Sequence, residues 1–495
     1  MTAQESREVA GKVERATLRQ TLTAWHLILL VVAAAAPMAA VVGIVPVALG
    51  LGNGAGFPLT LIAVIGVLAL FSVGYSAMSR RVVSTGAFYS YVTHGLGGVP
   101  GLGAAFVALT SYVAITVGAI AYFAFFAQLA VADLLGWSGS WIWFAASGAL
   151  LLAGLGYRGI DVSFRLIAVL LVAEFAILLC LVAAIIARLG WAAFPLDSFT
   201  LPAATSGAPG ISVMLAFLLF IGFESAALYS EETRDPRRSV SRATYGALVV
   251  MGGFYLVTTW VTVGAIGSER VSGVAGSAAG NLYFDLAADY IGPWIIGTMG
   301  VLMATSMFAT ALALHNVASR YLFSLGRQRC LPSLVGKVHD RHGVPHRASV
   351  AVSVTTGLVV LTGFLLGMSP MVGLGTVSAG LGTVGIMALQ CMASLGVIGY
   401  FRKRGDGRAW PTLVAPLLAF VGMTAGVFLA VSRFDLLSGA SNPVVNALPV
   451  LLVVAFVGGA AYGLALKGRR PDTYRRLTHN LATDEAALGV NDFTP

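Results

Sequence analysis

The sequence predicts an all-α polytopic membrane protein, and three observations favour this fold class. First, 58% of the 495 residues are hydrophobic and only 10% are charged, whereas a soluble domain usually carries about 25% charged residues. Second, the chain contains twelve apolar stretches that are long enough to cross a bilayer. Third, its basic residues are concentrated in alternate loops. Because so few charges cannot cover a water-facing surface, the composition excludes a soluble enzyme.

Each apolar stretch is expected to form a helix, because backbone exposed to lipid must satisfy its own hydrogen bonds. A span needs about 20 residues to cross a hydrocarbon core of ~30 Å. The third, eighth and tenth stretches are longer than this and are expected to tilt or protrude. The twelve predicted spans are residues 27–50, 59–78, 100–132, 140–156, 166–187, 210–229, 243–266, 291–318, 348–366, 371–400, 411–431 and 444–466.

The distribution of basic residues predicts the orientation of these spans. With the N terminus inside, 27 of the 30 Lys and Arg residues fall on the cytoplasmic side, and only Arg188, Arg270 and Arg433 fall outside. The positive-inside rule requires this kind of asymmetry. It predicts a cytoplasmic N-terminal tail at 1–25, a core of ten spans at 26–400, the last two spans within 401–466 and a cytoplasmic C-terminal tail at 467–495.

The remaining compositional signals exclude other classes of partner. The net charge of +9 is spread over the cytoplasmic segments as a topology signal, so no nucleic-acid partner is expected. Cys180, Cys330 and Cys391 lie far apart in no metal-binding motif, so neither a disulfide framework nor a metal site is expected. No small-residue cleavage site follows the first apolar stretch at a suitable distance, so we interpret the N-terminal tail as retained rather than cleaved.

The first and sixth spans contain residues that interrupt helices. Pro37, Gly43 and Pro46 lie within the first span, and Gly222 lies in the middle of the sixth. Proline removes a backbone donor, and glycine lowers the cost of leaving helical geometry. Interrupted spans at corresponding positions of two halves point to an inverted-repeat transporter, whose substrate binds between the breaks. The alternative is that these residues only kink packed helices.

Two acidic residues lie inside predicted spans. Glu224 follows the break in the sixth span, and Glu174 lies about nine residues into the fifth. An ionised carboxylate at the bilayer centre costs at least a few kcal/mol, so such residues usually face a cavity and serve transport or proton relay. The alternatives are structural: Glu224 as a permanent hydrogen-bond anchor for the broken helix, and Glu174 paired with a neighbouring polar group.

Four further residues are candidates for lining a cavity. Tyr112 and Thr116 are one helical turn apart in the third span, so they share a face. His315 and Asn316 lie in the eighth span. A lone histidine on an apolar helix is more often a hydrogen-bonded packing residue than a ligand, so for His315 the structural interpretation is the more common one.

Three motifs carry a resemblance to a known family. The stretch FLLFIGFESAALYSEETRDPRRSVSRATYGALVV (217–250) resembles the sixth span and following loop of the amino acid–polyamine–organocation superfamily, with Ser241 where the family often has proline. ASRYLFSLGRQRCLP (318–332) resembles its eighth-span exit, with Arg329 where glycine is usual, and GAFYSYVTHGLG (86–97) resembles its second-span exit. Together the motifs recur from about residue 26 to residue 400.

The resemblance implies a fold and a set of binding residues. The fold is the five-plus-five inverted repeat of the leucine transporter, with discontinuous first and sixth helices and two additional spans. Backbone amides of the first break would bind the carboxylate of the substrate, and carbonyls of the sixth its ammonium group. The implied substrate-binding residues are Ala39, Ala40, Val41, Val42 and Gly43 in the first span, and Leu218, Phe220, Ile221, Gly222, Phe223 and Ser225 in the sixth.

The resemblance also assigns roles to individual residues. Glu224 matches an acidic residue that is linked to pH response and gating in relatives such as the arginine/agmatine antiporter. Leu218 stands where that antiporter has its aromatic gate, so no cation–π clamp on a guanidinium is expected. Glu174 stands where some proton-coupled relatives carry a lysine in place of a bound cation. A carboxylate there would take up a proton or help to bind a cation.

These observations predict a permease that moves an amino acid or small amine across the bacterial inner membrane by proton-coupled symport and alternating access. The alternatives are an obligate exchanger and a membrane sensor that keeps the fold without transporting. No enzymatic motif rises above chance. The expected partners are a small-molecule substrate and the lipid bilayer. No cofactor is expected; the driving force is a proton gradient, with sodium left open, as is the oligomeric state.

Overall fold

The computed structural model of the protein describes residues 22–82, 86–137, 139–158, 160–278, 281–339, 343–438, 442–475 and 477. The predicted N-terminal tail at 1–25 lies outside these residues except for 22–25. The predicted C-terminal tail at 467–495 lies outside them except for 467–475 and 477.

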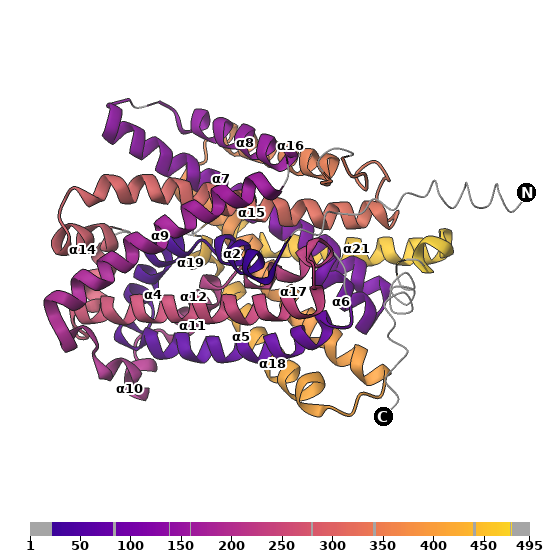
Figure 1. Ribbon diagram of the computed structural model, residues 1–495, viewed down its shortest axis with the longest axis horizontal. Coiled ribbons are helices and arrows are strands. Elements are labelled where there is room, and N and C mark those ends of the chain that lie inside the picture. The colour runs from indigo at the N-terminus through magenta and orange to yellow at the C-terminus, as the bar shows by residue number, and fades with distance from the viewer. Residues whose placement is uncertain are drawn as a thin grey trace, which may run out of the picture.

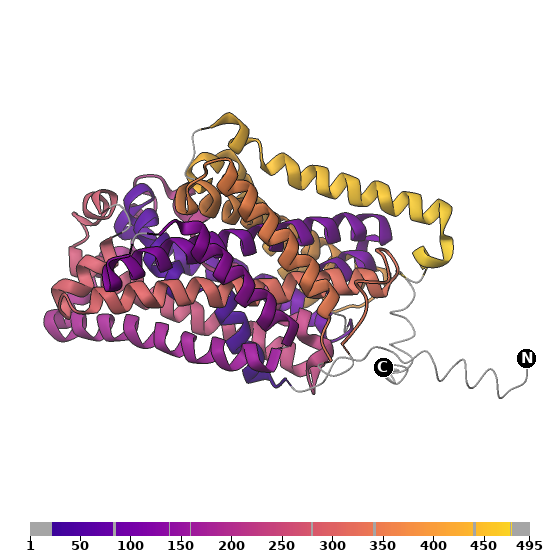
Figure 2. The same ribbon diagram turned by 90° about the horizontal axis from the view of Figure 1, so that it is seen from above.

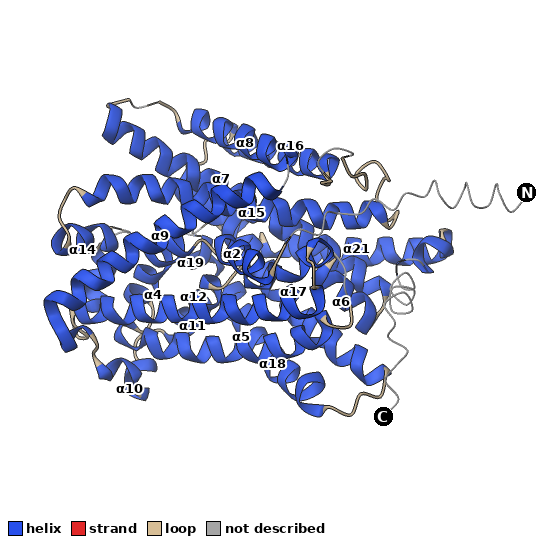
Figure 3. Cartoon of the chain, viewed as in Figure 1, coloured by secondary structure: helices blue, strands red, loops and turns tan. Residues whose placement is uncertain are grey.

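The described residues form a bundle of helices, most of which run along the long axis of the molecule (Figures 1 and 3). Within these residues no strand is present, and one isolated bridge pairs the backbones of Leu22 and Thr233. The predicted all-α class is therefore confirmed. Prolines stand in the first turn of several helices, including Pro58, Pro209 and Pro236, where the missing N–H has no helical partner to lose.

The helices have the following bounds. In the first part of the chain they are α2 (Ala24–Ala34), α3 (Pro37–Ala39), the π-helix η1 (Ala40–Ile44), α4 (Val45–Leu51), the 3₁₀-helix η2 (Gly54–Gly56), α5 (Phe57–Ser79), α6 (Ala87–Leu96), α7 (Gly98–Leu135), α8 (Trp141–Arg158), α9 (Ile160–Leu189), the 3₁₀-helices η3 (Gly190–Ala193) and η4 (Leu196–Phe199), α10 (Leu201–Ala204), α11 (Pro209–Leu219) and the 3₁₀-helix η5 (Phe223–Glu232). The remaining helices are α12 (Pro236–Ile266), α13 (Val271–Ser277), α14 (Leu282–Tyr290), α15 (Ile295–Arg327), α16 (His346–Leu365), the π-helix η6 (Pro370–Gly375), α17 (Thr376–Lys403), the π-helix η7 (Trp410–Val414), α18 (Ala415–Ser432), α19 (Phe434–Ser438), α20 (Pro443–Asn446) and α21 (Pro449–Arg469).

Within the described part of the chain, eleven helical segments are long and apolar enough to cross a membrane. They correspond to all the predicted spans except the fourth. At the position of the fourth lies α8, whose 18 residues end in Tyr157 and Arg158. At about 1.5 Å per residue α8 is about 27 Å long, slightly less than the hydrocarbon core. The count of twelve spans and the five-plus-five repeat therefore stay predictions.

Helix α7 lies at the centre of the bundle and packs against α6, α8, α15, α17 and α21. Small residues allow these helices to approach closely: a Cβ atom added to Gly118 of α7 would lie 2.9 Å from the carbonyl oxygen of Gly375. Small residues serve the same purpose at membrane helix interfaces in general. The last long helix, α21, lies at the edge of the bundle (Figure 2). Helix α7, together with α15 and α17 that pack against it, surrounds the site described next.

Candidate functional site

The first predicted span is broken between Ala34 and Pro37. Helix α2 ends at Ala34, and Ala36 has φ 49° and ψ 67°, which is the left-handed region. The ring of Pro37 disfavours a right-handed helical conformation in the residue before it, so the chain leaves the helix at Ala36. Pro46, in contrast, lies in the first turn of α4, directly after η1, and the helical run continues through it. The break therefore lies about one turn before the position predicted for it, residues 39–43.

The second break lies where the sequence predicts it. Helix α11 ends at Leu219, Gly222 has φ 106°, and the chain continues as a 3₁₀-helix from Phe223 to Glu232. Glycine adopts this left-handed conformation without the steric cost that a Cβ atom adds. The interruption of the sixth predicted span at Gly222 is confirmed.

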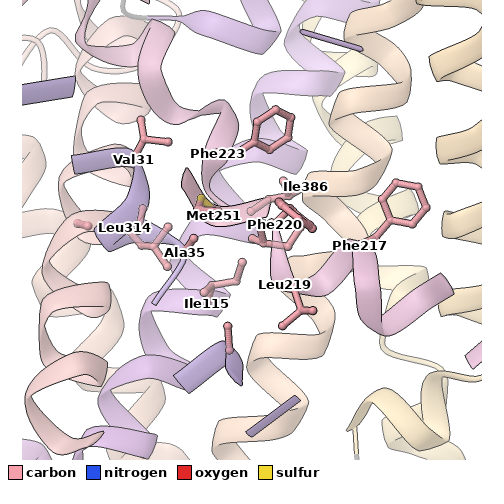
Figure 4. Packing of buried hydrophobic residues seen from close by; sticks show 14 of the residues in the cluster. Val31, Ala35, Ile115, Phe217, Leu219, Phe220, Phe223, Met251, Leu314 and Ile386 are labelled. Atoms are coloured by element: carbon pink, nitrogen blue, oxygen red, sulfur yellow. The ribbon is translucent and has the colours of Figure 1, made fainter. Parts of the chain in front are cut away.

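The two breaks lie in contact. A Cβ atom added to Gly222 would lie 3.0 Å from the carbonyl carbon and 3.1 Å from the Cβ of Ala34. Figure 4 shows Ala35 and Phe220, which follow α2 and α11, in the same buried apolar cluster. Segments that are about 190 residues apart in the sequence thus form a single site, as expected for a binding site between two broken helices.

The carboxylate of Glu224 accepts three hydrogen bonds. Tyr112 of α7 donates to its Oε1 at 3.0 Å, while the backbone N–H of Gly222 and the amide of Gln390 on α17 donate to its Oε2 at 3.1 and 3.3 Å. The residue is only 1% exposed. Three donors from three elements hold one carboxylate, so these contacts fit the anchor interpretation of Glu224: it ties the second break to α7 and α17.

The carboxylate of Glu174 has a different environment. Its Oε2 accepts a hydrogen bond of 3.4 Å from the backbone N–H of Met38, directly after the first break. The hydroxyl groups of Ser306 and Tyr255 lie near this carboxylate, and that of Tyr255 makes no hydrogen bond within the described residues. Pro37 has no N–H, so Met38 carries the first backbone donor of the helical run that begins there. A negative charge at this end of a helix is stabilised by the helix dipole.

Two of the other candidate residues, Thr116 and His315, make hydrogen bonds away from the two breaks. Thr116 donates to the carbonyl of Tyr112 one turn earlier on the same helix. His315 points to α16, where its Nε2 contacts the carbonyl of Ser349 at 3.1 Å and the hydroxyl of Ser353 at 2.9 Å. The contacts of His315 therefore match the packing interpretation rather than a place at the breaks.

The residues predicted to bind substrate are only partly brought together. Ala40, Val41 and Val42 are buried in η1, whereas Gly43 is exposed and lies at helical spacing from exposed Val47, on the outer face of the segment. Of the remaining residues, Ala39 and Leu218 are half-buried, Phe220, Ile221, Phe223 and Ser225 are buried, and Asn316 is buried with its carbonyl bound to Arg320.

Phe220 and Phe223 of the sixth segment contact different aromatic rings. Phe220 meets the ring of Tyr255 edge-on at 5.4 Å, so it lies near the residue whose hydroxyl approaches Glu174. Phe223 meets the ring of Phe71 on α5 edge-on at 5.8 Å. Phe220 therefore faces the first break, and Phe223 secures the 3₁₀-helix to α5.

Sequence reasoning missed Gln390, Tyr255 and Ser306, which complete the surroundings of the two carboxylates. Each is a polar residue inside a predicted span, and this was the available signal. Polar residues and tyrosines are common in these spans, however, and only the fold reveals which of them reach the carboxylates. Within the described ranges, no three His, Cys, Asp or Glu side chains gather as a metal site requires.

A buried ion pair was also missed. Arg320 of α15 donates from Nε and Nη2 to the two carboxylate oxygens of Glu232 at 2.6 and 2.9 Å, and from Nη1 to the carbonyl of Asn316. Its guanidinium lies 4.4 Å from the ring centroid of Tyr229. The carbonyl of Glu232 accepts the N–H of Leu22. One pair thus joins the end of the broken sixth segment, the eighth predicted span and the chain just before α2.

Comparisons with known proteins give one family model and several relatives that are named as transporters or permeases. The family model described as "Amino acid permease" matches residues 22–458. An uncharacterized transporter of Mycobacterium tuberculosis is 25% identical over 250 residues, which is 50% of each chain. A branched-chain amino acid permease of Lactococcus lactis is 30% identical over 131 residues, 26% of this chain and 27% of the relative. A glutamate/serine transporter of Bacillus subtilis is 25% identical over 130 residues, 26% and 24% of the two chains.

The extent of these matches differs between the comparisons. The family model covers most of the chain, whereas the chain spans about half the length of the curated relatives it matches, or less.

Proposed function

The chain belongs to the amino acid permease family, and we propose that it is a secondary active transporter that carries an amino acid across the bacterial inner membrane by proton-coupled symport and alternating access. One observation carries the proposal: the carboxylate of Glu174 accepts a hydrogen bond from the backbone N–H of Met38, immediately after the first break. Such an amide is the group that would bind the carboxylate of an amino acid.

This contact couples a proton to the substrate by competition. While Glu174 is ionised, it accepts the Met38 N–H and repels a second carboxylate from the same donor. Once a proton neutralises Glu174, the repulsion ends and the amide is free for the carboxylate of the substrate. A hydrogen bond to a charged acceptor contributes about 1.5–3 kcal/mol. The new bond from the Met38 N–H to the substrate carboxylate therefore offsets the loss of the bond to Glu174. The expected order is therefore proton first and amino acid second.

Glu224 has a supporting part in this proposal. Its contacts to Tyr112 and Gln390 attach the second break to α7 and α17. Alternating access then rocks the bundle formed by spans one, two, six and seven against these helices. Protonation can bias this rocking by no more than the difference in proton affinity between the two states.

The proposed substrate is a neutral amino acid with an apolar side chain. Apolar residues surround the breaks, among them Val31, Ala35, Ile115, Phe220 and Met251 (Figure 4). The buried carboxylate of Glu224 opposes an acidic substrate. A relative named as a branched-chain amino acid permease supports this class, while another is named as a glutamate/serine transporter.

The test uses the purified protein in liposomes with leucine as the probe. An imposed inward proton gradient should drive leucine accumulation, and a protonophore should abolish it. Uptake that depends on internal leucine instead of the gradient would identify an obligate exchanger. Leucine binding in a thermal-shift assay without any flux would identify a sensor. Either of these two results overturns the proposal of symport.

A further inference from the structure

A basic cavity lies between α5, α12 and the segment that begins with η7. It has a volume of about 360 Å³, within the range of ~300–1,000 Å³ that is common for ligand sites. Its walls include Arg80 and Arg81 at the end of α5, Tyr245 of α12, and Arg408 and Pro411 beside η7. Helix α5 packs against both α12 and η7, and α5 and α18 run side by side in Figure 1.

The cavity carries a net positive charge. Asp406 binds Arg408 through Nε at 3.0 Å and Nη2 at 2.7 Å, so one of the three guanidinium groups is neutralised. Arg80 donates to the neutral hydroxyl of Ser241 at 3.4 Å. Among the described residues, neither Arg80 nor Arg81 has a carboxylate within ion-pair distance. Two guanidinium groups thus remain to bind an anion, and their planar donors suit phosphate oxygens.

The inner wall supplies a further donor. Ser76 lines the cavity one turn before Arg80 and is 4% exposed. Its hydroxyl lies near that of Tyr245, but it meets hydrogen-bond geometry with none of the described residues. A buried hydroxyl without a partner is costly, so its position on the wall of a basic cavity points to a polar ligand.

The rim of the cavity is apolar. Trp410, adjacent to Pro411, is 56% exposed, and Val249, one turn after Tyr245 on α12, is 72% exposed. Tryptophan is enriched at the level of lipid headgroups. The positive-inside pattern places this end of α5 on the cytoplasmic side. A basic wall beside a lipid-facing apolar rim matches a ligand with a phosphate and acyl chains better than a free anion.

We propose that this cavity binds the phosphate headgroup of an anionic phospholipid of the cytoplasmic leaflet, with the acyl chains lying along α12 and α18. Arg80 and Arg81 bind the phosphodiester oxygens, and Ser76 donates to the same group. Basic pockets between membrane helices bind lipid headgroups in this way elsewhere. A lipid held here contacts α5, α12 and the segment that begins with η7 at the same time.

Native mass spectrometry of the full-length protein in mild detergent tests the proposal. Phosphatidylglycerol should be retained in preference to phosphatidylcholine with the same acyl chains. Arg80→Gln/Arg81→Gln should weaken its retention about thirty-fold, since each basic residue near an anionic surface lowers the dissociation constant about five-fold and the two factors multiply. Arg80→Lys/Arg81→Lys keeps both charges and should stay within a few-fold of the native chain.

The matched control is Arg469→Gln/Arg470→Gln, which removes two exposed charges at the end of α21 and should retain the lipid. Equal loss in this control and in the cavity variant would show a general surface effect and overturn the proposal. Equal retention of phosphatidylcholine would do the same. If millimolar inorganic phosphate raises the melting temperature while phosphatidylglycerol does not, the cavity binds a soluble phosphate and the lipid assignment is wrong.

Discussion

Gly222 packs directly against the backbone of Ala34, so that a Cβ atom at position 222 would lie 3.0 Å from the carbonyl carbon of Ala34. This contact is what makes two interrupted helices into one site. It depends on two properties of glycine at the same position, the absence of a side chain and the free access to φ 106°. Either property alone would make a larger residue unfavourable there.

We therefore predict that Gly222→Leu abolishes substrate binding and that Gly222→Ala destabilises the protein. The left-handed conformation alone costs an L-residue about 1–2 kcal/mol. The matched control is Gly43→Ala in the first broken segment, where a Cβ atom would meet no other atom within 4 Å. This variant should bind leucine normally. Leucine-dependent thermal shifts of the three variants measure both effects, and normal affinity in Gly222→Leu would show that the break is not the binding site.

The two breaks differ in how well the sequence predicts them. In the sixth span, Gly222 lies two residues before Glu224 within an apolar run, so a local signal marks the break. In the first span, two prolines, Pro37 and Pro46, are both candidate positions for the break. Pro46 lies where the π-helix η1 continues into α4 without a backbone break, whereas Ala36, before Pro37, leaves the helix. Both prolines restrict the preceding residue in the same way, yet Ala36 is left-handed and Val45 is right-handed helical, so the local sequence does not distinguish them.

A second prediction concerns coupling. Glu174→Gln should still bind leucine but should lose most of its gradient-driven accumulation between pH 8 and pH 5, because an amide cannot exchange a proton with the bulk. The native protein should accumulate leucine increasingly as the external pH falls. Glu269→Gln, in an exposed loop, is the matched control and should behave like the native chain. If Glu174→Gln keeps the native pH dependence in liposomes, Glu174 has no part in coupling.

A third prediction concerns the anchor. Tyr112→Phe removes one donor from the Glu224 carboxylate, and should lower the free energy of unfolding by about 1.5–3 kcal/mol, the range for hydrogen bonds to charged groups. Glu224→Gln should cost more, because a neutral carbonyl weakens both hydrogen bonds to the Oε2 position and the amide NH2 at the Oε1 position can no longer accept from Tyr112. The double variant should cost less than the sum of the two, as measured by unfolding in SDS. Strict additivity would contradict the contact.

A fourth prediction uses the charge of the basic cavity. The hydrogen bonds from Arg408 lower the pKa of Asp406 to about 2, so this carboxylate stays ionised from pH 8 to pH 5. The stability that its lowered pKa confers is present above the unfolded value of about 4 and is lost only as the pH falls towards 2. Retention of phosphatidylglycerol should therefore be constant over pH 5–8, whereas leucine accumulation changes. Asp406→Asn removes the opposing charge and should strengthen retention about five-fold. Weaker retention in this variant would contradict the charge balance proposed for the cavity.

The contacts that the sequence could not predict join residues that are distant along the chain. Arg320 lies in the motif at 318–332 and Glu232 in the motif at 217–250, yet they form one buried pair across 88 positions. Likewise, Gln390 reaches Glu224 across 166 positions. Composition and hydropathy determine which segments enter the membrane, but helix rotation and packing decide which polar side chains meet. Those depend on steric fit between helices, which leaves no local pattern.

The buried pair provides the last prediction. Arg320→Met leaves the carboxylate of Glu232 buried without its partner, and should destabilise the protein by about 3–5 kcal/mol. Glu232→Met should do comparable harm by leaving the guanidinium beside Tyr229 unpaired. Because apolar residues of similar volume replace both charges, Arg320→Met/Glu232→Met should be more stable than either single variant. Unfolding in SDS measures all three. A double variant less stable than both singles would mean that the pair acts through its other contacts, to the carbonyl of Asn316 and the chain at Leu22, rather than by mutual neutralisation.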